Sequence, residues 1–153
     1  MKNKIAKDIM TTDVIVANRS DSIVSIAKLL IKEKIGGMPV VDEDSKVVGI
    51  ISETDIMKKE KYVEAPQVLN ILQGLLFLDD FKQMETDMKR IAAYKVEDLM
   101  STEIVTVNEK DNFDDVANVM IKKSVNRVPV VDDMNILKGI ICRYDIIRAM
   151  YKE

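Results

Sequence analysis

The chain has 153 residues, about one domain, and its formal net charge of -3 with 32% charged residues argues against a broad nucleic-acid footprint. With no histidine and a single cysteine, Cys142, it excludes an intramolecular disulfide and His-dependent nucleophile pairs, and it argues against a transition-metal site. No apolar run is long enough to cross a bilayer and the first residues carry no signal-peptide core, so we expect a cytoplasmic protein without membrane contact.

An internal repeat dominates the chain. Residues 8–55 recur, shifted by 90 positions and without a gap, as residues 98–145, and laying 5–58 over 95–148 gives 17 identical pairs in 54. Two copies of a short unit usually pack together about a pseudo-twofold axis, because neither buries its apolar face alone. We therefore divide the chain into copy one (1–60), a helical insertion (61–94) and copy two (95–153), with ligand clefts expected between the copies.

Each copy begins with a short β-rich segment, 14–17 or 104–107, and continues into a helix. Asp21 and Asp111 are the predicted N-cap residues. Behind them apolar side chains recur at i, i+3, i+4, i+7 and i+8, which predicts one buried stripe on each helix. The stripe consists of Ile23, Ile26, Ala27, Leu30 and Ile31 in copy one, and of Phe113, Val116, Ala117, Met120 and Ile121 in copy two.

Two short apolar runs follow in each copy, separated by an acidic turn, which predicts a β-hairpin before a closing helix that starts near Thr54 or Tyr144. Pro39 and Pro129 are expected at the start of the middle strand, where a missing N–H is tolerated. A glycine inside the last strand, Gly49 or Gly139, indicates either a bulge or close approach of a backbone or ligand, or else helix-on-sheet packing. The predicted class is α/β, with two β-α-β-β-α repeats.

The insertion between the copies is predicted to be helical rather than disordered. Pro66 suits a first helical position, and large apolar residues follow at helical spacing over 68–76 and 81–91. So many apolar groups must cover something. A helical pair that closes the core, a cap over a ligand cleft and a contact with a second subunit all remain open.

Ser52-Glu-Thr-Asp55 lies where the last strand of copy one leads into the closing helix. One interpretation is a capping box, in which the hydroxyl and the carboxylate stabilise the first helical turn. The other is a ligand site, in which the hydroxyl and free N–H groups meet a phosphate and the carboxylate accepts hydrogen bonds from ribose hydroxyls. Asp145 recurs at the matching position of copy two.

Three blocks carry a family resemblance: Asp-Ile-Met-Thr at the start, Pro-Val-Val-Asp in the middle and Gly-Ile-Ile-Ser-x-x-Asp at the end. They resemble the cystathionine-β-synthase (CBS) domain, and two copies in order resemble a stand-alone tandem CBS pair, or Bateman module. The resemblance implies clefts for adenosine-containing ligands such as AMP, ADP, ATP, S-adenosylmethionine or cyclic di-AMP, and association as disc-shaped homodimers.

By position, the resemblance implies that Asp55 holds ribose and Ser52 phosphate in copy one, and that Asp145 holds ribose in copy two. Copy two has Cys142 in place of the hydroxyl, and Arg127 and Arg143 are candidates to supply phosphate contacts instead, although Arg127 also suits a surface ion pair. Gly37 stands opposite Arg127 in the repeat and gives room without charge, so we expect unequal sites. The family's adenine slot falls on Val14, Met38, Ile104 and Val128, each of which also suits the core.

The sequence thus predicts a regulatory sensor of an adenosine nucleotide, with no obligatory cofactor, no metal and no catalytic residues. The ligand would shift the population of conformations, and a partner protein would read the change. The alternative is a ligand-independent dimerisation or interaction module. Cys142 is not expected to be a reactive thiol, since only Arg143 and the turn would lower its pKa.

Overall fold

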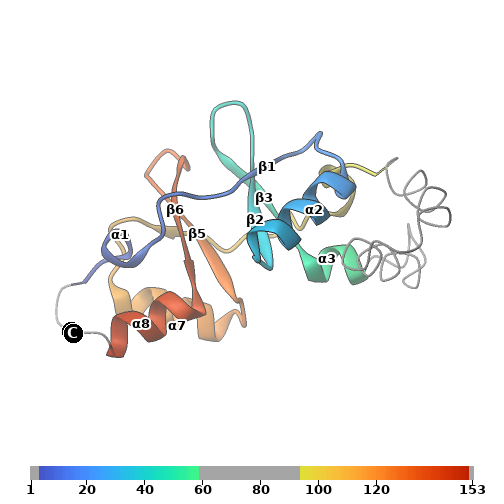
Figure 1. Cartoon of the computed structure of the whole chain (residues 1–153). Coiled ribbons are helices and arrows are strands. Elements are labelled where there is room, and N and C mark those ends of the chain that lie inside the picture. Colours follow the sequence, from blue (N-terminus) through green and yellow to red (C-terminus); the bar gives the residue numbers. More distant parts are fainter. Residues whose placement is uncertain (1–3, 59–93, 152–153) are drawn as a thin grey trace. The chain divides into compact units, whose positions relative to one another are not determined.

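The computed structural model describes residues 4–58 and 94–151, which fall into two compact units (Figure 1). Unit one contains Met1–Ile15, Val41–Val48 and Glu103–Glu153, and unit two contains Val16–Val40 and Gly49–Thr102. Each unit therefore takes segments from both copies of the repeat. The predicted helical insertion lies outside the described residues, apart from Tyr94.

Unit two is built mainly from copy one. Its sheet has the order β1-β2-β3, with β1 at Ala17–Asn18, β2 at Gly37–Val41 and β3 at Val47–Ser52. Helix α2 (Ile23–Glu33) joins β1 to β2, and α3 (Glu53–Lys58) follows β3 directly. The short helix α6 (Val96–Leu99) comes from copy two and buries Val96 and Leu99.

Unit one is built mainly from copy two in the same order. Its sheet, β4-β5-β6, comprises Val107–Asn108, Arg127–Val131 and Leu137–Cys142, with β4 parallel and β6 antiparallel to β5. Helices α7 (Phe113–Lys122) and α8 (Arg143–Tyr151) complete the copy, and α1 (Ala6–Ile9) joins it from copy one. Ala6 and Ile9 lie in the same apolar cluster as Val116 and Ile141. The predicted α/β class and the order strand, helix, strand, strand, helix are confirmed.

The first strand of each copy is shorter than predicted and starts later. Only Ala17 and Val107 of the predicted segments belong to β1 and β4, and the residues before them are half-buried without regular pairing.

The predicted helix caps were wrong by one residue. Ser22 is the N-cap of α2, and its hydroxyl accepts the N–H of Ser25 at 3.1 Å. Asn112 holds the same position in α7 without a side-chain cap bond. Asp21 and Asp111 instead accept the N–H groups three residues before them, because their carboxylates close the turn that leads out of β1 or β4.

The predicted buried stripe holds along α2 and α7 as far as their eighth residues, with Ala117 half-buried, and fades at the last predicted position. Ile23, Leu30, Phe113 and Met120 are buried, whereas Ile31 is half-buried and Ile121 is 74% exposed. Burial of Ile121 was therefore wrongly predicted. At about 100° per residue, position i+8 lies roughly 80° from position i, at the margin of the stripe.

Pro129 was predicted at the start of its strand, but it is the third residue of β5, opposite Ile140 of β6. Its missing N–H costs no ladder bond. Ile140 directs both its N–H and its C=O to Thr11, at 3.0 and 2.9 Å, and β4 pairs only with Val130 and Val131. Pro39 is likewise the third residue of β2.

Both strand glycines admit the close approach of another backbone. A Cβ on Gly49 would lie 2.8 Å from the sulfur of Met100 and 3.0 Å from the carbonyl oxygen of Ser101. A Cβ on Gly139 would lie 2.5 Å from the sulfur of Met10 and 2.9 Å from the carbonyl oxygen of Thr11. The neighbour in each case is the chain just after α6 or α1, so each glycine makes room for the N-terminal segment of the other copy.

Candidate functional site

One aspartate geometry recurs through both copies. Within residues 4–58 and 94–151, a carboxylate oxygen accepts the backbone N–H of the residue three positions earlier in six places, at 2.8 or 2.9 Å. Such a bond fixes the start of a helix or a tight turn. The six residues are Asp8, Asp21, Asp55, Asp98, Asp111 and Asp145. The two predicted ribose aspartates thus share a structural role with four others, and only further contacts set them apart.

The predicted capping box at the start of α3 is present. The N–H and hydroxyl of Ser52 both donate to Oδ2 of Asp55, each at 2.9 Å, and the Ser52 oxygen accepts the Asp55 N–H at 3.3 Å. The other carboxylate oxygen of Asp55 accepts a hydrogen bond from the hydroxyl of Ser101, at 2.9 Å. This second oxygen meets a hydroxyl donor, which is the chemistry that a ribose would offer.

Ser101 was not predicted as a site residue. It follows α6, belongs to copy two, and exchanges both backbone hydrogen bonds with Ile50 of β3. Thr11 holds the matching position after α1 and pairs with Ile140 in the same way. The sequence signal was a hydroxyl residue immediately after the methionine of the first block in both copies, but nothing in the sequence indicated which copy it would contact.

Asp145, at the start of α8, is the one buried charged residue in the described part of the chain, 7% exposed. One carboxylate oxygen accepts the N–H of Cys142 at 2.8 Å, and the other forms an ion pair with Nη2 of Arg148 at 2.9 Å. The pair links two positions three residues apart on one helix. Asp145 also borders a cavity of about 210 Å³ that lies entirely within unit one.

The structure brings Arg127, Cys142 and Arg143 together at one end of the β5–β6 pair. Arg127 lies opposite Cys142 in the ladder, and the N–H and Nε of Arg143 donate to the carbonyl oxygens of Asn126 and Val125, at 3.1 and 3.4 Å. Burial raises the pKa of the Cys142 thiol, and the negative charge of Asp145 adds to this, against a smaller opposing effect of Arg127. The thiol is therefore protonated at neutral pH.

The remaining predicted residues divide between the units. Gly37 and Met38 lie with Ser52 and Asp55 in unit two, whereas Val14, Ile104 and Val128 lie with Asp145 and the two arginines in unit one. Met38 and Val128 are 0% exposed, so both residues belong to the cores. Val14 and Ile104 are half-buried. In the described residues, no group of three or more Cys, Asp or Glu side chains is placed to hold a metal ion.

The positions of these residues match a known family. Residues 6–62 and 96–152 each match the CBS domain, and together they cover more than half of the chain. The chain belongs to the CBS domain family. The two matches make it a CBS pair, and within the described ranges it has no helix of the length and apolar character that a bilayer crossing needs.

Relatives and solved structures agree with this assignment. The CBS pair is 33% identical over 156 residues to protein MJ1426 of Methanocaldococcus jannaschii, covering 95% of this chain and 90% of the relative. It spans only about half of two other curated relatives, 47% and 52% of their lengths.

Two of the similar proteins have crystal structures with adenosine-containing ligands. CBSX2 of Arabidopsis thaliana in complex with AMP superposes with a TM-score of 0.71 at 26% identity, over 97% of this chain and 96% of that one. The CBS domain pair of protein MJ0100, in complex with 5'-methylthioadenosine and S-adenosyl-L-methionine, gives 0.68 at 30% identity, over 96% and 95%.

Proposed function

We propose that this CBS pair is a regulatory module that binds an adenosine-containing ligand through Asp55 and Asp145 and transmits a conformational change to a partner protein. The observation that carries the proposal is the repeated placement of these carboxylates at the first turn of the helix after the last strand. Similar chains crystallised with AMP, or with 5'-methylthioadenosine and S-adenosylmethionine, support the ligand class.

The fixed geometry of Asp55 suits a ribose. Oδ2 accepts the N–H and the hydroxyl of Ser52, and these two bonds fix the plane of the carboxylate and so the orientation of Oδ1. A ribose hydroxyl could share or replace the Ser101 hydroxyl there without changing the type of donor. Because Ser101 belongs to the N-terminal segment of copy two, a ligand at Asp55 would directly change a hydrogen bond made by that segment.

The two sites are proposed to be unequal. Copy one keeps a hydroxyl at Ser52 and has the neutral Gly37, whereas copy two has Cys142 with Arg127 and Arg143 beside it. A guanidinium matches a phosphate through two hydrogen bonds, so phosphate contacts in copy two would come from arginine rather than from a hydroxyl.

The test is isothermal titration calorimetry with AMP, ADP, ATP, S-adenosylmethionine and cyclic di-AMP on ligand-free protein. We expect micromolar or tighter binding of at least one compound, weakened roughly tenfold or more by Asp55→Ala or Asp145→Ala. Asp98→Ala is the matched control, since it removes the same type of backbone bond at α6. Binding lost equally in the control would indicate a merely structural role, and flat titrations of the unaltered protein would reject the proposal.

The alternative function, a ligand-independent interaction module, is favoured by one observation: both carboxylates already have partners within the chain. It predicts no change of melting temperature with any of these compounds. Under either function we propose no catalytic residue and no resident cofactor, and we propose that the protein is cytoplasmic. We also propose that the repeats end and begin where the sequence divides them, with the first CBS repeat at 1–60, the insertion at 61–94 and the second repeat at 95–153.

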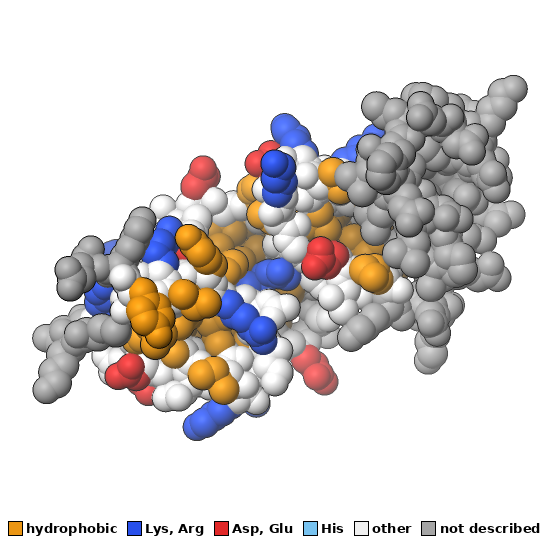
Figure 2. Space-filling model, turned by 60° about the horizontal axis from the view of Figure 1, so that its bottom comes forward, with side chains coloured by type: hydrophobic (Ala, Val, Ile, Leu, Met, Phe, Trp, Pro, Cys, Tyr) orange, Lys and Arg blue, Asp and Glu red, His pale blue; other side chains and the backbone are white. Residues whose placement is uncertain are grey.

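We also propose a homodimer. Helix α8 exposes Tyr144, Ile147 and Tyr151, at 70%, 53% and 81%, and their spacing places them on one side of the helix. Figure 2 shows hydrophobic side chains gathered over this helix. Analytical ultracentrifugation should show a dimer, and Ile147→Asp should dissociate it. Met134→Asp is the control, because it places the same charge on an exposed residue of the hairpin turn, and it should leave the dimer intact.

A further inference from the structure

The cavity beside Asp145 has a wall that the predicted site does not include. Its six lining residues come from the segment around α1 and from α8, and all belong to unit one: Lys4, Asp8, Ile9, Asp145, Arg148 and Ala149. Neither Arg127 nor Arg143 is among them. The carboxylate of Asp145 therefore accepts the N–H of Cys142 at the start of α8 and also belongs to a cavity with charges of its own.

The charges of the cavity balance. Its lining includes two cations, Lys4 and Arg148, and two carboxylates, Asp8 and Asp145. Arg148 is held by its ion pair with Asp145, and Asp8 accepts the N–H of Ile5 at 2.9 Å. Nζ of Lys4 reaches the carbonyl oxygen of Ala149 at 3.5 Å, the outer limit of a hydrogen bond, and an ammonium has two further donors.

This distribution discriminates between tails on an adenosyl ligand. The two cations of the cavity are already balanced by its two carboxylates, so the several negative charges of a polyphosphate would remain uncompensated there. An α-amino acid group carries one charge of each sign. Its carboxylate would face Lys4, its ammonium would face Asp8, and the methylene groups between them would lie along Ile9 and Ala149.

We propose that the cavity is a subsite for an α-amino acid group, carried by an adenosyl ligand whose ribose is held by Asp145. The proposal rests on the adenosyl-binding function above and adds the class of ligand. A free amino acid would present the same group without the nucleoside, so the experiment includes both sources.

The experiment compares S-adenosylhomocysteine with 5'-methylthioadenosine by calorimetry on the full chain carrying Asp55→Asn, which weakens the copy-one site. Both compounds are neutral thioethers of adenosine, and they differ in the amino acid tail. We expect the tail to strengthen binding roughly tenfold, and Lys4→Ala or Asp8→Asn to remove most of that gain without changing the affinity for methylthioadenosine. Asn at position 8 keeps an oxygen that can accept the Ile5 N–H.

Lys7→Ala is the matched control, because Lys7 is an exposed lysine on α1 that does not line the cavity. Equal affinity for the two thioethers, or a Lys4→Ala effect of the same size on both, would overturn the subsite while leaving the adenosyl function standing. If no adenosyl compound binds even the unaltered chain, the proposed function fails. Binding of free L-methionine that is lost in Lys4→Ala would then assign the cavity to a free amino acid, and its absence would reject the subsite as well.

Discussion

At the scale of single residues, the identities between the copies are mostly structural contacts. Asp42 and Asp132 each accept two N–H groups of their own hairpin turn, and Gly49 and Gly139 leave room for a passing backbone. These roles follow from residue type and could be predicted from the sequence in kind. Their partners could not, because Met100 and Ser101 are about 50 positions from Gly49, and spacing carries no information on which segments meet.

Gly139→Ala should lower the free energy of unfolding by roughly 1–3 kcal/mol, as expected for overpacking. The methionine sulfur can move away from the new Cβ, but the carbonyl oxygen of Thr11 is held by its bond to Ile140. Urea denaturation would measure the change. Ala149→Gly on α8 serves to gauge an ordinary exchange between glycine and alanine, and an effect of Gly139→Ala no larger than that would contradict the close approach.

Cys142 should react slowly with iodoacetamide at pH 7.5. Burial raises the pKa of its thiol, so the rate should climb only above the ordinary thiol pKa of about 8.5. The raised pKa also means that the contribution of this thiol to stability is present below pH 8.5 or so and is lost as the pH rises through the folded-state pKa. Alkylation followed by mass spectrometry from pH 6 to 10 would measure the rate, and fast reaction at pH 7 would contradict the raised pKa.

At the scale of elements, helical periodicity predicted the two long helices well, and short apolar runs between turn residues predicted the strands of the hairpins. Periodicity failed where an element is too short to show a period. Helices α1 and α6 have four residues each, and strands β1 and β4 have two. The candidate site depends on these short elements, because Ser101 and Lys4 lie beside them, and for that reason neither was predicted.

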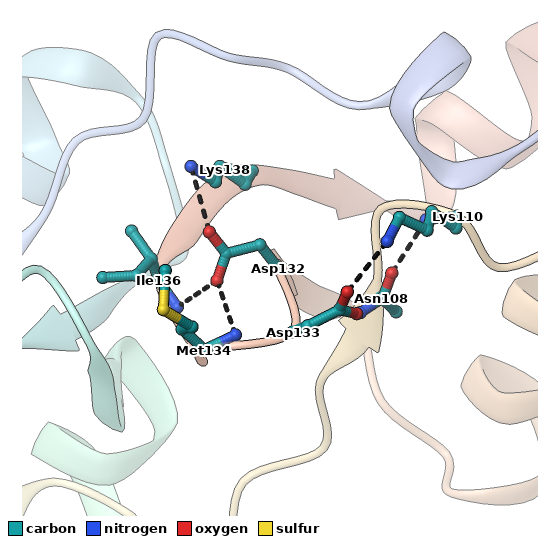
Figure 3. Close-up of polar contacts among 7 residues, drawn as sticks. All are labelled: Asn108, Lys110, Asp132, Asp133, Met134, Ile136 and Lys138. Carbon is teal, nitrogen blue, oxygen red and sulfur yellow. Dashed lines mark hydrogen bonds and ion pairs between the residues drawn. The ribbon is translucent and has the colours of Figure 1, made fainter.

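The hairpin turns illustrate how one carboxylate sets an element. Oδ1 of Asp132 accepts the N–H groups of Met134 and Ile136, at 2.9 and 3.0 Å, while Lys138 pairs with its other oxygen (Figure 3). Asp133, next in sequence, pairs with Lys110 and Asn108 on the exposed surface. Asn135 closes the turn in the left-handed region, with φ 64°.

Asp132→Ala should lower the melting temperature more than Asp133→Ala. The first change leaves two turn N–H groups without their acceptor, whereas the second removes an exposed ion pair, which contributes little. Differential scanning calorimetry of the two variants would measure this. Equal losses, or a larger loss in Asp133→Ala, would show that the turn does not depend on the Asp132 carboxylate.

The same two carboxylates predict a response to acid. Burial pushes the pKa of Asp132 upward, but the bonds from Ile136, Lys138 and Met134 outweigh it and lower the pKa, and Lys110 with Asn108 lowers that of Asp133. Their stabilisation is therefore present above the ordinary carboxyl pKa of about 3.9 and is lost as the pH falls through the lowered values. The melting temperature of Asp132→Asn should fall less steeply below pH 4 than that of the unaltered protein. An unchanged pH profile would contradict the stabilising role of the Asp132 carboxylate.

At the scale of the whole molecule, the repeat predicted two copies but placed the boundary differently from the packing. Each copy gives its N-terminal helix to the unit built mainly from the other copy. This exchange was invisible in the sequence, since an internal repeat specifies what each copy contains and not which copy its ends contact.

A fragment of residues 94–153 should therefore fold poorly alone. It lacks α1, so Ala6 and Ile9 are missing from its apolar cluster and the edge of β6 at Ile140 has no partner. Circular dichroism should show that a synthetic peptide of residues 1–15 restores structure, and that a Met10→Asp peptide does so less well. A fragment whose circular dichroism spectrum is already that of a folded protein and does not change when the peptide is added would contradict the need for α1.

The close contacts at the two glycines also bear on recombination between relatives. Met10 must fit Gly139, and Met100 must fit Gly49, so each N-terminal segment is matched to the strand of the opposite copy. A chimaera joined at the repeat boundary near residue 94 would separate both matched pairs at once. A chimaera that exchanges residues 1–15 together with 103–153 would keep both matched pairs. Segments should therefore be exchanged between relatives by packing unit rather than by repeat.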